Sequence, residues 1–106
     1  MRSYNRHVAL TDRQKKHLRR LGHALHPLVL VGQRGYTSGV VSELMQTLHD
    51  HELVKVRARV GDRENRNLVL ARLAAGSGAE LVHQIGNVGL FYKKNNKLNK
   101  ILLPDS

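Results

Sequence analysis

The segment from Leu28 to Ser38 reads Leu-Val-Leu-Val-Gly-Gln-Arg-Gly-Tyr-Thr-Ser, and it decides the fold. Its first four residues form a short apolar run whose length and branched side chains favour a buried strand over a helix. Gly32 and Gly35 then break the run. Thr37 or Ser38 can cap the helix that follows, which we expect to end near Asp50. Its apolar side is supplied by Val40, Val41, Leu44, Met45 and Leu48.

Helices and strands alternate on both sides of this segment. Thr11 and Gln14 form a capping-box pattern, and leucines at helical spacing predict a first helix over residues 12–25, before Pro27. From Leu53 to Val60 the hydrophobic period is two, which predicts a strand. Asp62 can cap a third helix with apolar residues Leu68, Val69, Leu70, Leu73 and Ala74, ending at residues 76–78. Two strands, 81–85 and 90–92, are predicted around a turn at 86–89.

The predicted order is therefore α-β-α-β-α-β-β, an α/β fold with three helices on a mixed four-stranded sheet. A chain of 106 residues fits one domain. We expect a basic N-terminal arm at 1–9, a folded domain at 10–94, and a basic C-terminal tail at 95–106 that packs in part through residues 101–103. Of Phe91 and Tyr92, one is expected in the core because neighbouring strand residues face opposite ways.

The charge of the chain indicates a polyanionic partner. Eighteen Lys and Arg oppose eight Asp and Glu, giving a net charge of +10. Nucleic acid is the first candidate and an anionic membrane the second, but no apolar run approaches the roughly 18–20 residues of a membrane span. With no signal-like segment and no cysteine, we expect a cytoplasmic protein without disulfides and without a membrane partner.

The Gly-x-x-G stretch formed by Gly32, Gln33, Arg34 and Gly35 is the main candidate RNA-binding site. Glycines allow a phosphate to approach the backbone closely, and a helix N-terminus next to them favours negative charge. Arg34 adds a guanidinium suited to phosphate. The alternative is that the two glycines only make a tight turn.

Further candidate RNA-binding residues surround this loop. Lys55, Arg57 and Arg59 alternate along one face of the second predicted strand, and roughly 6.7 Å between alternate residues is close to the spacing of backbone phosphates. Lys15, Lys16, Arg19 and Arg20 give the first helix a basic side, and Tyr36 could stack on one base. A solvated charged surface is the alternative for both basic groups. Only four aromatic residues occur and none lies in an RNP-like motif, so backbone contacts are favoured over base reading.

The sequence contains no convincing catalytic or metal-binding set. The histidine pairs His23/His26 and His49/His51 lack a carboxylate third ligand, and no Walker loop is present. Asp62, Glu64 and Glu80 have plainer roles near a cap or a strand start. The second Gly-x-x-G, residues 86–89, precedes no helix and is interpreted as a turn. We therefore expect no enzymatic activity, no cofactor and no metal.

Several of these pieces together resemble the CRM domain family, named for chloroplast RNA splicing and ribosome maturation. The matching pieces are Leu10-Thr11 with Gln14, Leu18-Arg19, Ala24 to Pro27, Val29 to Gly35, His51 to Val56, Ile85-Gly86 and Phe91 to Lys93. The resemblance implies a fold similar to the C-terminal domain of translation initiation factor three, and RNA binding without catalysis. The chain departs from many members in having Gln33 and Arg34 where a lysine is common.

With one copy of the domain, the chain resembles the stand-alone bacterial members of the family, and this resemblance implies an association with precursors of the large ribosomal subunit. The hypothesis is therefore a monomeric assembly factor that grips the backbone of ribosomal RNA, with pre-large-subunit particles as partners and no small-molecule substrate. The alternative is a module that docks on a ribosomal or translation protein and uses its charge for steering. A nuclease or RNA-modifying enzyme is a distant third.

Overall fold

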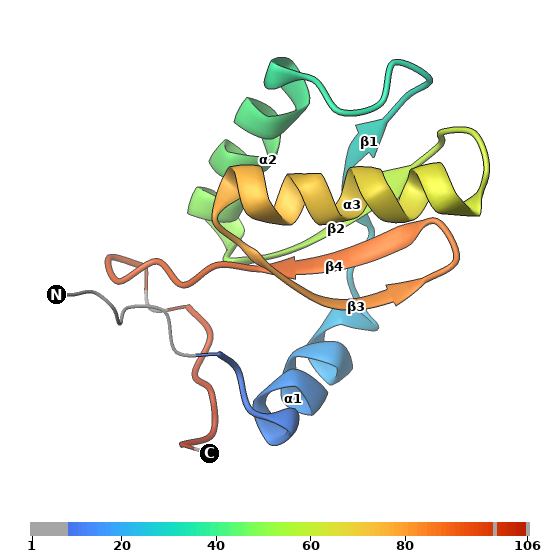
Figure 1. Cartoon of the computed structure of the whole chain (residues 1–106). Coiled ribbons are helices and arrows are strands. Elements are labelled where there is room, and N and C mark those ends of the chain that lie inside the picture. The colour runs from blue at the N-terminus through green and yellow to red at the C-terminus, as the bar shows by residue number, and fades with distance from the viewer. Residues whose placement is uncertain (1–8, 99, 106) are drawn as a thin grey trace, which may run out of the picture.

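The computed structural model describes residues 9–98 and 100–105, so most of the predicted N-terminal arm lies outside the described residues. Three helices and a four-stranded sheet follow in the predicted order. Figure 1 shows them as α1 (Asp12–Gly22), β1 (Pro27–Val31), α2 (Ser38–His51), β2 (Leu53–Ala58), α3 (Arg63–Ser77), β3 (Glu80–Ile85) and β4 (Val88–Tyr92). None of the described helices is long and apolar enough to cross a membrane.

The sheet is mixed, with strand order β1-β2-β4-β3. β1 and β2 are parallel and are connected through α2, whereas β4 lies antiparallel to both β2 and β3. The hairpin between β3 and β4 turns at Gly86, whose φ of 59° is in the left-handed region that favours glycine. These pairings confirm the predicted mixed sheet with a terminal hairpin.

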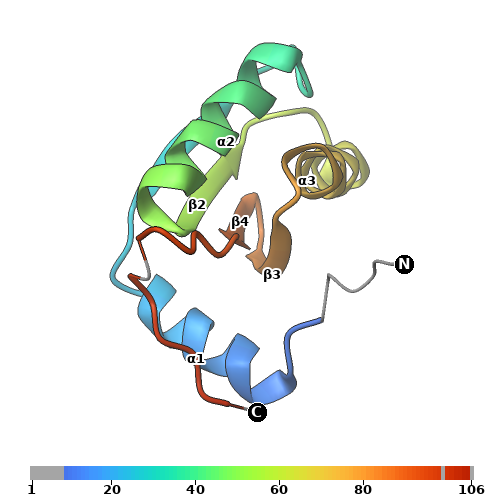
Figure 2. The ribbon, with the colours of Figure 1, turned by 90° about the vertical axis from the view of Figure 1, so that its left-hand side faces the viewer.

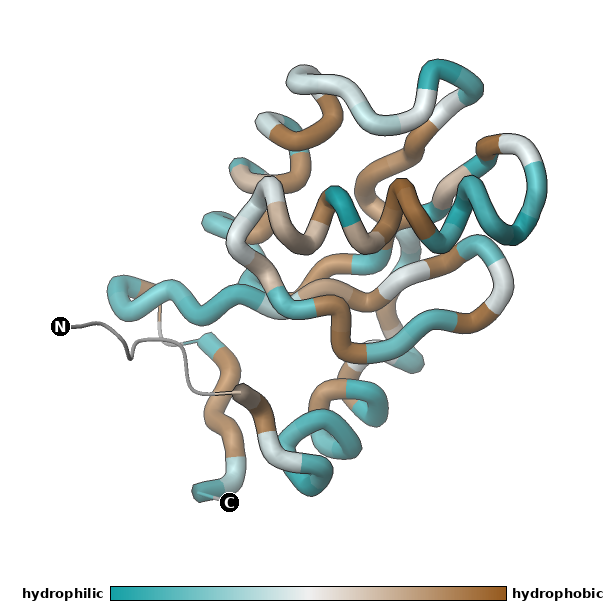
Figure 3. The backbone as a smooth tube through the Cα atoms, in the orientation of Figure 1, coloured by the Kyte–Doolittle hydropathy of each residue, from teal (hydrophilic) through white to brown (hydrophobic). Residues whose placement is uncertain are grey.

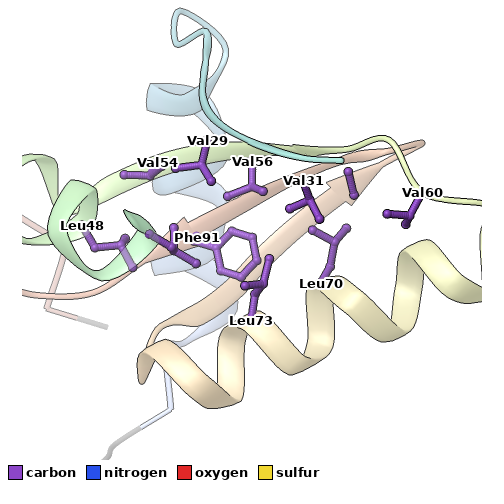
Figure 4. Close-up of a cluster of buried hydrophobic side chains, with 11 residues drawn as sticks. Val29, Val31, Leu48, Val54, Val56, Val60, Leu70, Leu73 and Phe91 are labelled. Carbon is purple, nitrogen blue, oxygen red and sulfur yellow. The ribbon is translucent and has the colours of Figure 1, made fainter. Parts of the chain in front are cut away.

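The two faces of the sheet are covered by different parts of the chain. α2 and α3 pack on one face over a cluster that includes Val29, Val56, Leu73 and the fully buried Phe91 (Figure 4). α1 packs on the other face with the C-terminal tail beside it (Figure 2), over a second cluster. That cluster contains Leu18, Leu53, Val82, Leu90 and Tyr92, with Leu10, Leu25, Ile101 and Leu103 packed against it. Because both faces are covered here, Phe91 and Tyr92 are both buried, and the expectation of only one core aromatic is wrong.

Each helix begins at a cap that the sequence predicts, and of the two candidates for α2 the cap is Thr37. Thr11 and Gln14 form both bonds of a capping box, while Thr37 Oγ1 accepts from the Val40 amide and Asp62 Oδ1 from the Asn65 amide. α1 is shorter than expected, because it ends at Gly22 instead of residue 25. Beyond Arg20 the backbone bonds tighten, because the His23 amide donates to the Arg20 carbonyl at 3.3 Å and the Leu25 amide to the Gly22 carbonyl at 3.0 Å, each three residues back instead of four.

Glu52 joins the end of α2 to the C-terminal tail. It is fully buried, and its φ of 66° is unusual for a residue other than glycine. Its carboxylate oxygens accept from the amides of Asn95 at 2.7 Å, and of Lys100 and Ile101 at 2.9 Å. Three charge-assisted bonds hold the tail in place and satisfy a carboxylate that burial would otherwise penalise.

β1 differs from the buried strand that its apolar run predicts. It is an edge strand, and only Val29 and Val31 are buried under the helices. Leu28 and Leu30 point to the other face and remain 52% and 57% exposed. An apolar run therefore marks a strand here without marking burial on both faces.

Candidate nucleic-acid interface

The Gly-x-x-G stretch forms a β-turn after β1. The Gly35 amide donates to the Gly32 carbonyl at 2.9 Å, which leaves Gln33 and Arg34 exposed at the two central positions. The tip of this loop is the teal, hydrophilic end of the β1–α2 connection in Figure 3. Gly35 has φ of 71° and is required by the turn, whereas a Cβ at Gly32 would meet no atom within 4 Å. The fold thus requires one glycine and leaves the backbone at the other uncovered.

α2 does not start directly after the turn. Tyr36 and Thr37 lie between Gly35 and the first residue of the helix, Ser38. Thr37 satisfies the Val40 amide with its side chain, and its carbonyl accepts from Val41. The amides of Ser38 and Gly39 precede this first helical bond, so they have no acceptor within the helix. They add a partial positive charge on the loop side of α2.

Tyr36 fixes the loop to α3. The Arg72 guanidinium lies over its ring, with Cζ 4.1 Å from the centroid. A Cβ at Gly76 would overlap the Tyr36 hydroxyl, so the ring passes α3 at a point where only glycine leaves room. With one face under Arg72 and its edge against α3, Tyr36 anchors the loop, and its expected stacking on a base stays a prediction for the other face of the ring.

A groove of about 530 Å³ separates the turn from α3. Gln33 and Arg34 line one side, and Asn65, Leu68 and Arg72 line the other. Leu68, one of the apolar residues of α3, is 57% exposed in this groove. Two guanidinium groups, amide side chains and one apolar side chain suit a ligand with both negative charge and an apolar surface.

The basic residues of β2, and Arg59 directly after it, are only partly joined to this groove. The Arg59 amide donates to the Val31 carbonyl at 2.8 Å, which places Arg59 beside Gly32. Lys55 and Arg57 are half-buried and lie further along β2, on the face opposite α2 and α3. The three cations form a line that runs along the strand from the loop.

The basic residues of α1 lie at the other end of the molecule from the loop (Figure 1). Lys15 pairs with Glu80 at 3.9 Å on the β3 side. Lys16 and Arg20 line a separate groove of about 550 Å³ together with Arg13 and the tail. Arg19 is half-buried. The structure thus does not bring Lys15, Lys16, Arg19 or Arg20 together with the Gly-x-x-G turn.

Sequence reasoning missed the contribution of α3. Asn65, Leu68 and Arg72 are spaced by three and four residues, so they form one stripe of the helix. Nothing local marked this stripe as facing the loop, because the contact depends on where the sheet places both elements.

Two of the three acidic residues considered for catalysis have structural partners. Asp62 caps α3 and Glu80 pairs with Lys15. Within residues 9–98 and 100–105, no group of three His, Cys, Asp or Glu is arranged to hold a metal ion. Burial raises the pKa of the Tyr92 hydroxyl, and the Glu52 carboxylate adds to this, but Tyr92 belongs to the second cluster and not to the groove.

Comparison with known proteins identifies similar chains. Residues 10–93 match the CRS1/YhbY (CRM) domain. A probable RNA-binding protein of Pseudomonas aeruginosa is 44% identical over 90% of this chain and 91% of its own length, and one of Bacillus subtilis is 35% identical over 90% and 99%. The solution structure of a hypothetical Staphylococcus aureus protein, proposed there to bind RNA, superposes with a TM-score of 0.79 and 28% identity over 91% of this chain and 100% of its own.

Proposed function

Because the chain belongs to the CRS1/YhbY (CRM) domain family, we propose that it binds RNA through the sugar-phosphate backbone, with the Gly-x-x-G turn as the main contact. The observation that carries this proposal is the uncovered backbone at Gly32 beside the exposed Arg34. A phosphate can approach there without meeting a side chain, and the free amides at the start of α2 favour its charge. The names of the relatives as RNA-binding proteins support the ligand class.

Within this function we propose ribosomal RNA as the target and a role in assembly of the large ribosomal subunit. The net charge of +10 favours rapid, salt-sensitive association with such a polyanion. If about five or six phosphates of a single strand are neutralised, log affinity falls with log salt at a slope near −4.

The test compares wild type with Arg34→Gln and with Lys97→Gln in binding to fragments of ribosomal RNA across a salt series. Both variants remove one positive charge from an exposed position, but Lys97 lies in the tail, away from the turn. Arg34→Gln should reduce the steepness of the slope by about 0.7, the value for one lost contact to a single strand. Lys97→Gln should leave the slope unchanged.

A third variant, Gly32→Val, tests the close approach of the backbone. Gly32 is better suited to this than Gly35, whose left-handed φ would strain any replacement. Loss of affinity in Gly32→Val with unchanged stability supports the proposed contact. Equal affinities in wild type, Arg34→Gln and Gly32→Val would remove the turn from the binding site. Cosedimentation of wild type, but not of Arg34→Gln, with precursor large subunits would support the assembly role.

A further inference from the structure

The sheet face that carries α1 is covered only in part. Leu18 is fully buried there, and a Cβ at Gly22 would lie 2.9 Å from Leu90 Cδ2, so α1 packs tightly over β4. Tyr92 and Leu53, further toward the tail, are buried in the same cluster. The opposite end of this face, toward the β1–α2 loop, carries side chains that stay exposed.

Four of these side chains form one row across the sheet. Leu30 of β1 is in register with Arg57 of β2, Arg57 with Val88 of β4, and Val88 with Ile85 of β3. Residues paired in this way point to the same face. Leu30 and Ile85 are 57% and 68% exposed, and Arg57 and Val88 are half-buried between them. With strands about 4.8 Å apart, the row spans roughly 14 Å.

The chemistry of the row fits an unpaired nucleobase. Single exposed aliphatic residues are ordinary, but here three aliphatic side chains, two exposed and one half-buried, flank one guanidinium on a sheet surface. Bases of a single strand expose apolar faces that pack on flat side chains, including the plane of arginine. A duplex hides those faces, so it could offer only its phosphates.

The row also lies next to the proposed backbone site. Arg59 is beside Gly32, and Arg57, near the end of β2, is two residues before it in the chain and therefore within roughly 7 Å. A strand held by its phosphate at the turn can therefore continue over Arg59 onto the row. A protein partner is less well matched, because a stable interface needs about 800 Å² on each side and this row has a cation at its centre.

We propose that Leu30, Arg57, Val88 and Ile85 form a platform for one or two unpaired bases of the RNA that the turn holds. The proposal rests on the RNA-binding function and adds the substrate class, which is single-stranded or locally unpaired RNA. The apolar contacts distinguish this platform from the salt-dependent phosphate contacts of the loop.

The experiment compares Leu30→Ser with Leu102→Ser, using a single-stranded RNA of 12 nucleotides and the same strand in a duplex. Both leucines are exposed, and Leu102 lies in the tail beside α1. Leu30→Ser should weaken single-strand binding about fivefold, the factor for roughly 40 Å² of apolar surface no longer buried. Duplex binding and the salt slope should not change, and Leu102→Ser should behave as wild type.

Arg57→Lys gives a second readout because it keeps the positive charge and removes the planar guanidinium group on which a base could pack. It should weaken single-strand binding while leaving the salt slope unchanged; full retention of affinity would mean that Arg57 serves only as a charge. Equal effects of Leu30→Ser and Leu102→Ser would overturn the platform, as would a wild-type dimer that Leu30→Ser converts to monomer without loss of RNA affinity. If Arg34→Gln still lowers the slope in those cases, the proposed function stands without the platform.

Discussion

The close approach of Tyr36 to Gly76 determines whether a Gly76→Ala substitution stabilises or destabilises the protein. Gly76 is exposed near the end of α3, where replacing glycine by alanine ordinarily stabilises a helix by up to about 1 kcal/mol. Here the new methyl group would overlap the Tyr36 hydroxyl. Overpacking of this kind costs about 1–3 kcal/mol, so Gly76→Ala should destabilise the wild type by about 1 kcal/mol net.

Removing the hydroxyl should reverse this result. In a Tyr36→Phe background the nearest ring atom, Cζ, is 3.4 Å from the new methyl position, close to ordinary contact. Gly76→Ala should then stabilise the protein by up to about 1 kcal/mol, giving a coupling energy near 2 kcal/mol. Urea denaturation of the four proteins of the cycle measures both values.

The same cycle tests whether the anchor holds the loop for binding. Gly76→Ala alone should also weaken RNA binding, since a displaced Tyr36 moves the Gly-x-x-G turn away from α3. The Tyr36→Phe/Gly76→Ala double variant should recover most of that loss. The anchoring role is refuted if Gly76→Ala changes stability by the same amount and with the same sign in both backgrounds.

Three further outcomes follow from buried and paired groups. Tyr92 has a raised pKa in the folded protein, so the unfolded chain ionises first and stability should fall as pH rises above about 10. Urea midpoints across pH should show this fall in wild type to a greater extent than in Tyr92→Phe. Glu52→Gln replaces one acceptor oxygen by an amide NH2 group that faces backbone N–H donors, so urea denaturation should show a loss of about 1–3 kcal/mol in the free energy of unfolding. Glu43→Gln, at an exposed position of α2, should change the free energy of unfolding little. Lys15→Ala breaks only the 3.9 Å pair with Glu80 at the surface and should change stability by less than about 1 kcal/mol in a thermal melt.

The sequence predicts those parts of the structure that local chemistry determines. Thr11, Thr37 and Asp62 cap their helices as expected, because a cap involves only the next three residues. The strand alternation of β2 likewise predicts which side Val54 and Val56 occupy. Even the parallel pairing of β1 and β2 follows, since a helix of this length connects them.

Features that depend on distant neighbours could not be predicted in this way. Leu30 is exposed because β1 is an edge strand and because α1 covers another part of that sheet face. The apolar run in the sequence predicts neither the position of the strand in the sheet nor the position of α1. Gly89 resembles a turn glycine in sequence, yet a Cβ there would lie 3.1 Å from Leu81 and Phe91 and 3.3 Å from Leu70. Its role is packing between layers, which only the assembled sheet reveals.

The contacts of Glu52 show that the folded unit extends further along the chain than the segment that matches the family. The family match stops at residue 93, but the amides that neutralise this carboxylate belong to Asn95, Lys100 and Ile101. A chain trimmed to the match would keep every residue by which its family is recognised. It would also lose the three amides that pair with the Glu52 carboxylate and the tail segment that lies against it, so the folded unit extends beyond the family match.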